Sequence, residues 1–386
     1  HHHQSSLEGV MDFAATPQPL FANELQRNQV VGRFHRIVNY FETTEQPAPS
    51  SRSSTNPYNR PALIRLTFEY ARSTESQDRF LGAFFQSLAL GILDDNENID
   101  LSDDGEVEDF RSPLFGFADY LIANFFLPLR ATTNRTPQPS PIYHAAVQQT
   151  NTQEEQQRIQ DYVGTPERLS ALRGSCLVRD RHRCVITRQF DKAEGIARWM
   201  KDKHRAVDDD GNPLDPNKKE FLEVAHILPH ALTKEDNNEL DESRRAAIAI
   251  LNMFDTGVIY LIEGDDINRS RNALTLTHDM HQDFGRFDIF FERIPNTPAH
   301  TYRIQAFDPW VNTYCPVTRT LFQHPSIDPP SERLLALHSA IGHILHLSGA
   351  GDYIQSILDD MEHGIVQEDG STQLGVLVKL AMRMHA

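Results

Sequence analysis

Two histidines and one asparagine occur in short segments whose residue types suit phosphate chemistry. His226 lies in Leu222-Glu-Val-Ala-His-Ile-Leu-Pro229, and Asn272 and His281 begin and end Asn272-Ala-Leu-Thr-Leu-Thr-His-Asp-Met-His281. A neutral imidazole accepts a proton near pH 7, and its ring nitrogen also binds divalent metal ions. Hydrolysis of a phosphodiester needs a base that activates water and a cation that stabilises negative charge. We therefore expect these segments to meet in one hydrolytic site.

The order and spacing of these motifs, followed by Phe284-Gly-Arg-Phe-Asp288, resemble those of the HNH nucleases. The Ala-His-Ile-x-Pro form of the first motif resembles a subgroup that is common in fungal proteins. The resemblance covers residues 183–292 and implies a ββα-metal fold. It also implies a metal-dependent endonuclease that cleaves DNA, with RNA left open as the other substrate.

The resemblance also assigns roles to individual residues. It makes His226 the general base that activates water, Asn272 the residue that orients the loop around this base, and His281 a metal ligand. The implied cofactor is one divalent ion, with Mg²⁺ expected first and Mn²⁺ or another ion as the alternative.

One position departs from many HNH sites, which have Asp or His immediately before the first catalytic histidine. This chain has Ala225 there. Glu223 lies on the same face of an ideal strand as Ala225, so we expect it to be the first substitute as a metal ligand. The other candidates are His230, Asp279 and Asp283. The departure also motivates an alternative function, a catalytically impaired HNH-derived module that binds nucleic acid or protein.

The cysteine content argues against a structural zinc ion. The chain has three cysteines and no CxxC pair, and Thr187 stands where a second zinc-binding cysteine would follow Cys184. We therefore expect packing, without zinc, to support the ββα unit. An odd, small number of cysteines fits a reducing compartment, so we expect an intracellular location, cytoplasmic or nuclear. Secretion after removal of a signal segment is the alternative.

The distribution of charge indicates a local phosphate-binding surface. The whole chain has a net charge of −17, which opposes general binding to nucleic acid. Residues 165–206 nevertheless contain eleven Lys or Arg and five Asp or Glu, a net charge of +6. A solvated helix face would explain the same composition. The arginines expected to contact phosphate are Arg179, Arg181, Arg183, Arg188, Arg269, Arg271 and Arg286.

The elements that must position these residues predict an α+β protein with two domains. We interpret residues 1–10 as an expression-tag remnant, 11–130 as a helical domain of unassigned role, and 131–160 as a Pro/Thr/Gln-rich linker. Residues 161–386 form the expected nuclease domain, with its core at 183–292 and a C-terminal helical tail. The helical domain is a candidate surface for homo-oligomer formation, and we expect no membrane span because no apolar run is long enough.

Apolar periodicity also predicts the individual elements. We expect strands at 183–186, 221–228, 258–262, 273–277, 287–293 and 302–307. The expected helices are 27–42, 61–93, 115–129, 166–180, 331–347, 353–363 and 374–384. The acidic stretch 94–109 is expected to be a loop.

Overall fold

The computed structural model describes residues 20–44, 58–93, 101–133, 166–229, 242–310 and 313–363. The chain divides into two compact units. Unit 1 contains residues 1–128, 235–259 and 343–386, and unit 2 contains residues 129–234 and 260–342. Helices combine with small sheets, which confirms the α+β class. The expected tag remnant, most of the expected linker and the expected helix at 374–384 lie outside the described residues.

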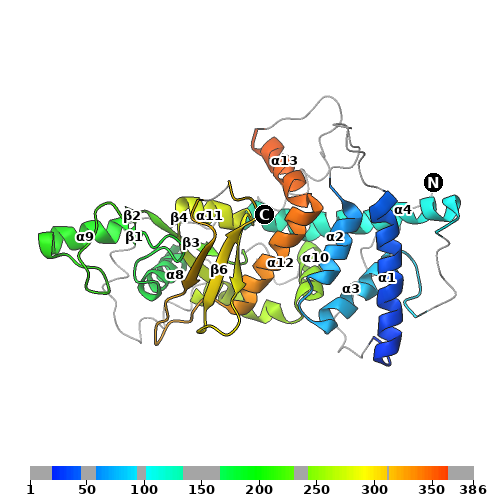
Figure 1. Ribbon diagram of the computed structural model, residues 1–386, viewed down its shortest axis with the longest axis horizontal. Coiled ribbons are helices and arrows are strands. Elements are labelled where there is room, and N and C mark those ends of the chain that lie inside the picture. The colour runs from blue at the N-terminus through cyan, green and yellow to red at the C-terminus, as the bar shows by residue number, and fades with distance from the viewer. Residues whose placement is uncertain are drawn as a thin grey trace. The chain divides into compact units, whose positions relative to one another are not determined.

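The described part of unit 1 is built from helices around an aromatic core (Figure 1). Phe34 lies at the centre of this core, with its ring 4.9 Å from Phe68 and 4.9 Å from Phe84. Phe117 packs edge-on against the ring of Phe84. The helices are α1 (Glu24–Thr44), α2 (Arg60–Glu69), α3 (Thr74–Ser87), α4 (Asp104–Leu121), η1 (Ile122–Phe126), α10 (Glu242–Phe254) and α13 (Ala350–His363). Three of the described helices contain a unit boundary, namely α5 (Leu127–Thr133), η4 (Val258–Leu261) and α12 (Glu332–Ser348).

Capping side chains explain where the helices of unit 1 depart from the predicted ranges. The expected helix at 61–93 is two helices, because Ser73 accepts a hydrogen bond from the Ser76 amide and begins a new helix. The acidic stretch expected to be a loop is helical from Asp104, because Asp103 accepts hydrogen bonds from the amides of Gly105 and Glu106.

One helical stretch among the described residues, Asp104–Thr133, is long and apolar enough to cross a membrane by composition alone. Half of its most apolar window is buried inside the protein. A core helix meets the same criterion, so this stretch is weak support for a membrane span. The absence of a span stays a prediction.

A ββα element lies within unit 2 (Figure 1). Strand β3 (Leu222–His226) pairs antiparallel with β4 (Ala273–Thr277), which runs directly into helix α11 (His278–Gly285). Helix α8 (Pro166–Arg179) packs against the pair through a buried cluster of Leu172, Cys176, Val224 and Ala273. Burial of these apolar side chains holds the two motif segments next to each other.

Two further sheets complete the described part of unit 2. Strands β1 (Phe190–Asp191) and β2 (Lys219–Glu220) pair in parallel. Strands β5 (Ile289–Arg293), β6 (Thr301–Ala306) and β7 (Val317–Thr320) form an antiparallel sheet. Helix α9 (Lys192–Asp202) follows β1 and leads into the short helix η2 (Lys203–Arg205). Before β4 lie the short helices η5 (Gly264–Asn268) and η6 (Ser270–Asn272).

Two of the predicted strands are wrong. Residues 183–186 form a turn with a single bridge, between Arg183 and Phe190. The chain turns here because the Thr187 amide donates a hydrogen bond to the sulfur of Cys184. The run looks like a strand because three successive residues, Cys184, Val185 and Ile186, are all buried. The expected strand at 258–262 is instead the short helix η4 (Val258–Leu261).

Candidate active site

The register of β3 and β4 places the motif residues in two pairs. His226 lies opposite Ala273 at one end of the strand pair, so Asn272 is next to it. Glu223 lies opposite Leu276 near the other end, where α11 begins and carries His281. The antiparallel pairing therefore gives each histidine a polar neighbour from the other motif segment.

Asn272 bonds to two segments of the chain, one that follows His226 and one that precedes Asn272 itself. Its side chain is fully buried. The amide oxygen accepts a hydrogen bond from the Leu228 amide at 3.0 Å, and the amide nitrogen donates to the Leu228 carbonyl at 2.9 Å. The same nitrogen donates to the Ile267 carbonyl at 3.0 Å. Asn272 thus ties the segment after His226 to the segment that ends in Asn268.

His226 is 4% exposed, and its ring contacts the segment that ends in Asn268. Its Nε2 lies 3.2 Å from Oδ1 of Asn268. An amide oxygen only accepts hydrogen bonds, so Nε2 carries the proton of the neutral ring and Nδ1 carries the lone pair. The contact with Asn268 therefore holds the orientation of His226 and favours the tautomer with the proton on Nε2.

His281 has the opposite arrangement of its ring nitrogens. Nδ1 lies 2.7 Å from Oε2 of Glu223. Nε2 is buried and has no hydrogen-bond partner among the described residues. A buried polar atom without a partner is costly, and an imidazole nitrogen in this state is suited to a ligand. A carboxylate on Nδ1 is a usual companion of a metal-binding histidine, because it leaves the lone pair on Nε2.

Glu223 interacts with two imidazoles through its two carboxylate oxygens. Oε1 lies 2.9 Å from Nδ1 of the exposed His278, while Oε2 contacts His281. The hydrogen bond from His281 lowers the pKa of Glu223 to about 2, against a smaller opposing effect of burial and with further help from His278. The hydrogen bond to Glu223 raises the pKa of His278. The acid is therefore ionised at neutral pH and favours protons on the two facing nitrogens.

Helix α11 also carries two of the other proposed metal ligands, the exposed Asp279 and the half-buried Asp283. His230 lies outside the described residues. Within the described ranges, no three His, Cys, Asp or Glu side chains are grouped so that they could hold a metal ion by themselves. The donor set around His281 thus fits an ion that keeps most of its ligands as water or substrate oxygen.

Arg179 is a correction to the predicted phosphate surface. Its side chain is buried, with Nη2 bonded to Asp180 at 2.8 Å and to the Ala273 carbonyl at 3.0 Å. Nη1 donates to the Ser270 carbonyl at 2.6 Å. The guanidinium of Arg179 therefore braces the chain before β4 and has no room to reach a phosphate.

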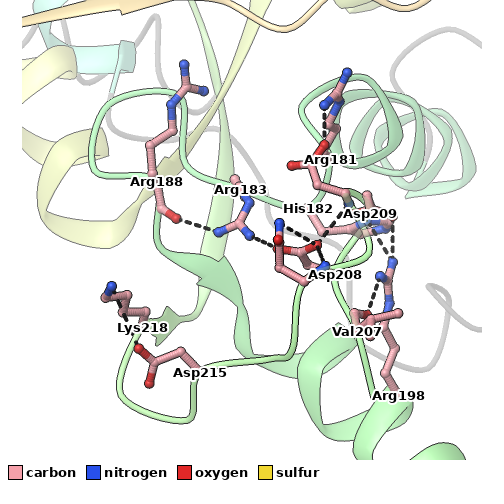
Figure 2. A network of polar contacts seen from close by, with 12 residues as sticks. Arg181, His182, Arg183, Arg188, Arg198, Val207, Asp208, Asp209, Asp215 and Lys218 are labelled. Atoms are coloured by element: carbon pink, nitrogen blue, oxygen red, sulfur yellow. Dashed lines mark hydrogen bonds and ion pairs between the residues drawn. The ribbon is translucent and has the colours of Figure 1, made fainter. Parts of the chain in front are cut away.

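Several other arginines of the basic segment are paired with acids, as Figure 2 shows. Asp208, Asp209 and Asp210 follow the basic segment and contact Arg183, Arg198 and Arg181 respectively. His182 also contacts Asp209, with Nδ1 2.8 Å from the carboxylate. Burial opposes the shift, but the hydrogen bonds from His182 and Arg198 still lower the pKa of Asp209 to about 2. We call these three arginines and three acids the arginine–aspartate network.

The remaining predicted phosphate contacts differ in their availability. Asp266 pairs with both Arg269 and Arg271. Arg188 donates to the Thr320 carbonyl at 2.7 Å, and burial, helped by nearby Arg319, lowers its pKa to about 10. Arg286 is exposed at the end of α11 and makes no ion pair with another described residue. Of the seven predicted arginines, Arg286 is the one best placed to meet a phosphate.

Sequence reasoning missed Asn268 and the contact between Glu223 and His281. Asn268 lies four residues before Asn272 in a polar segment, and nothing in its spacing distinguishes it from a surface asparagine. Glu223 was singled out for its strand face, which is also the reason that it reaches α11. Thr277 occupies the N-cap position of α11, but its side chain makes no capping hydrogen bond.

Residues 184–292 match the HNH_2 family model, which is described as HNH endonuclease. The match contains β3, β4 and α11 with both histidines, so this part of the chain is an HNH domain of nuclease type. The predicted resemblance is confirmed, while its Ala-His-Ile-x-Pro subgroup stays a prediction. HNH nucleases act on nucleic acid and generally use a divalent metal ion. No curated protein and no solved structure matches the chain.

Proposed function

We propose that the HNH domain of this protein is a metal-dependent endonuclease that hydrolyses phosphodiester bonds of DNA. The observation that carries the proposal is the opposite anchoring of two buried imidazoles within the matched segment. His226 is held at Nε2 by an amide oxygen, and His281 is held at Nδ1 by a carboxylate. One ring is thereby prepared to take a proton and the other to bind a cation.

The proton transfer is assigned to His226. Asn268 accepts the hydrogen bond from Nε2–H, so Nδ1 is the atom that removes a proton from the attacking water. The same amide oxygen faces the positive charge that develops as the ring becomes imidazolium, which favours the transfer. Asn272 supports this geometry because it bonds to Leu228 and Ile267, on the two segments that carry the base and its anchor.

The metal site is assigned to His281. Its buried Nε2 would be the protein nitrogen that holds a divalent ion, and such an ion supplies stabilisation of negative charge on the phosphate and the leaving oxygen. Glu223 orients this ligand through Nδ1, which supports an outer role in place of direct coordination. Mg²⁺ suits a site completed by water and phosphate oxygens, and Mn²⁺ is the alternative because it binds imidazole more readily.

Nicking of a supercoiled plasmid tests the proposal, because a circular substrate has no ends for an exonuclease. With Mg²⁺ or Mn²⁺ the wild-type protein should nick the plasmid, and a chelator should stop the reaction. His226→Ala should lower the rate by about 10²-fold or more, the usual loss when a general base is removed. His324→Ala is the matched control, since that histidine contacts Ser326, outside the site.

Equal nicking by the wild type and His226→Ala would refute the role of the base. A second outcome would identify the alternative function. If neither DNA nor RNA is cut while nucleic-acid binding survives His226→Ala, the domain is a catalytically impaired binding module. Ala225 is the feature that favours this alternative, because it removes a ligand that many HNH sites have.

A further inference from the structure

Helix α9 lies in unit 2, within the segment that matches the HNH family model (Figure 1). It presents an apolar face to solvent. None of its residues is buried. Ile196, Trp199 and Met200 lie at helical spacing on one face and are 48%, 45% and 67% exposed. Phe221, immediately before β3, is 59% exposed. Large apolar side chains grouped in this way commonly mark a binding surface.

Cations border these apolar side chains. The Lys192 ammonium lies 4.6 Å from the ring centre of Phe221, and Lys192 precedes Ile196 by one helical turn. Lys203 follows the helix and is exposed. The ring of His204 packs edge-on against Trp199, with centroids 5.1 Å apart, so this turn lies beside the apolar face. We call Lys192, Ile196, Trp199, Met200, Lys203 and Phe221 the α9 surface.

The cations of the α9 surface differ from those of the arginine–aspartate network. Arg181, Arg183 and Arg198 are bonded to carboxylates. Lys203 makes no ion pair with any described residue, and Lys192 contacts a ring in place of an acid. In a chain with a net charge of −17, exposed cations beside aromatic rings therefore favour an anionic partner.

We propose that the α9 surface binds unpaired bases of the nucleic-acid substrate, with Trp199 stacking on a base and the lysines contacting phosphates. This inference rests on the proposed nuclease function, which gives nucleic acid as the class of ligand. A stacked duplex covers the faces of its bases, whereas an unpaired strand offers both base faces and phosphates. Exposed aromatic rings next to cations, as on the α9 surface, match an unpaired strand.

The position of Phe221 connects this surface to the active site. Phe221 is five residues before His226 along β3, which corresponds to about 16 Å at roughly 3.3 Å per strand residue. That span is covered by about five nucleotides at the 3.4 Å rise of a stacked strand, and by fewer in a more extended unpaired strand. One short nucleic-acid segment can therefore contact the α9 surface and His226 together, and we expect cleavage near an unpaired region.

Tryptophan fluorescence of the full chain tests this inference. The chain contains two tryptophans, so Trp310→Phe leaves Trp199 as the single reporter. A thymidine 12-mer added in EDTA should quench this fluorescence, and a duplex of equal length should quench it less. Measured by the anisotropy of a labelled 12-mer, Trp199→Ala should weaken binding about tenfold, as expected for loss of one stacked base.

The lysines provide a matched pair of variants. Lys203→Gln should lower the slope of log affinity against log salt by about 0.7, the loss of one phosphate contact on a single strand. Lys201→Gln removes the same charge from the opposite face of α9 and should leave the slope unchanged. Unchanged Trp199 fluorescence with the 12-mer, or equal affinity of Trp199→Ala, would overturn the inference. A fluorescence change that depends only on protein concentration would instead assign the α9 surface to a second copy.

The two proposals fail separately in these measurements. Binding in EDTA requires no catalysis, and plasmid nicking reports the catalytic site. If nicking depends on His226 but the 12-mer leaves Trp199 unaffected, only the inference about the α9 surface is refuted. If the 12-mer quenches Trp199 but no substrate is cut, only the proposed endonuclease is refuted.

Discussion

The pair of anchored histidines and the arginine–aspartate network lie in the same unit but use their polar groups differently. In the first region, Asn268 and Glu223 each hold one nitrogen of an imidazole. In His281 the second nitrogen, Nε2, has no hydrogen-bond partner among the described residues and can bind a ligand. In the network, Asp208, Asp209 and Asp210 neutralise the charges that a phosphate would need. A polar contact therefore prepares a group for function only where some bonding capacity remains.

The largest effect should come from the residue that aligns the catalytic base. Asn272→Ala removes two hydrogen bonds to the buried backbone of Leu228 and one to Ile267. We expect the free energy of unfolding to fall by about 3 kcal/mol, because buried polar groups lose their partners. We also expect plasmid nicking to fall by more than about 10²-fold, because His226 loses its alignment.

Asn252→Ala is the matched control for this variant. Asn252 accepts a hydrogen bond from the Gly257 amide at 3.1 Å in unit 1. The Asn252→Ala variant should be less stable than the wild type. It should still nick plasmid at the wild-type rate at temperatures where circular dichroism shows folded protein. Wild-type nicking by folded Asn272→Ala would contradict the orienting role.

Glu223→Gln should have the next largest effect. The substitution keeps the size of the side chain and removes the charge that faces His281 and His278. Loss of an outer-sphere carboxylate typically weakens metal affinity or activity by about 10–100-fold. The metal concentration that gives half-maximal nicking should rise, whereas Glu220→Gln, an exposed residue of β2, should not change it. An unchanged metal requirement would show that Glu223 has no part in the site.

A third histidine, His338, provides a contrast, because it is buried and bonds to no carboxylate among the described residues. His338 stacks on Phe284 at 3.8 Å, and its Nε2–H donates to the Phe284 carbonyl at 3.0 Å. Burial lowers the pKa of His338 to about 3. An unfolded histidine binds a proton below about pH 6.5, and the folded one does so only near pH 3. Its contribution to stability is therefore complete above pH 6.5 and is lost as the pH falls toward 3.

The expected loss is about 1.4 kcal/mol for each pH unit below 6.5. Urea unfolding at pH 7.5 and pH 5.5 measures it. His338→Leu should be less stable at pH 7.5 but should lose less stability between the two values than the wild type. The other histidines contribute equally to the wild type and to His338→Leu, so the difference between the two losses of stability reports His338. An equal loss in both proteins would contradict the lowered pKa of His338.

The smallest effect should separate Arg286, which has no ion pair with a described residue, from the paired Arg183. Arg286→Gln should weaken binding to a 20-base-pair duplex a few-fold and lower the salt slope by about 0.9, because one phosphate contact is lost. Arg183→Gln should leave the slope unchanged and lower stability by about 1–3 kcal/mol, because its partner, the carboxylate of Asp208, is buried. A smaller slope in Arg183→Gln would show that the network opens to bind phosphate.

Local sequence patterns predicted much of the fold of unit 2. The strand at 273–277 was predicted with the observed bounds, and β3 lies within the predicted 221–228. Periodicity failed at 183–186 and 258–262, where buried apolar residues occupy a turn and a short helix. Three or four successive apolar residues fit several backbone conformations, and only the surrounding contacts select one.

The division of the chain shows a second kind of difference. Helices α10 and α13 belong to unit 1, although the sequence analysis assigned both segments to the nuclease domain. Phe254 at the end of α10 stacks on Phe125, more than a hundred residues earlier in the chain. Such a contact leaves no mark in a local pattern, since any buried apolar side chain has the same periodicity.

The sequence by itself determined the identity of the HNH domain, because His226, Asn272 and His281 have fixed types and spacing within short segments. Tertiary structure decided how each of these groups is held. Asn268 and Glu223 reach the two histidines across 42 and 58 residues of chain. It also decided that Asp208 to Asp210 neutralise arginines that composition marked as phosphate contacts. Whether a charged or hydrogen-bonding group is available to a ligand depends on its partner, and partners meet only when the chain folds.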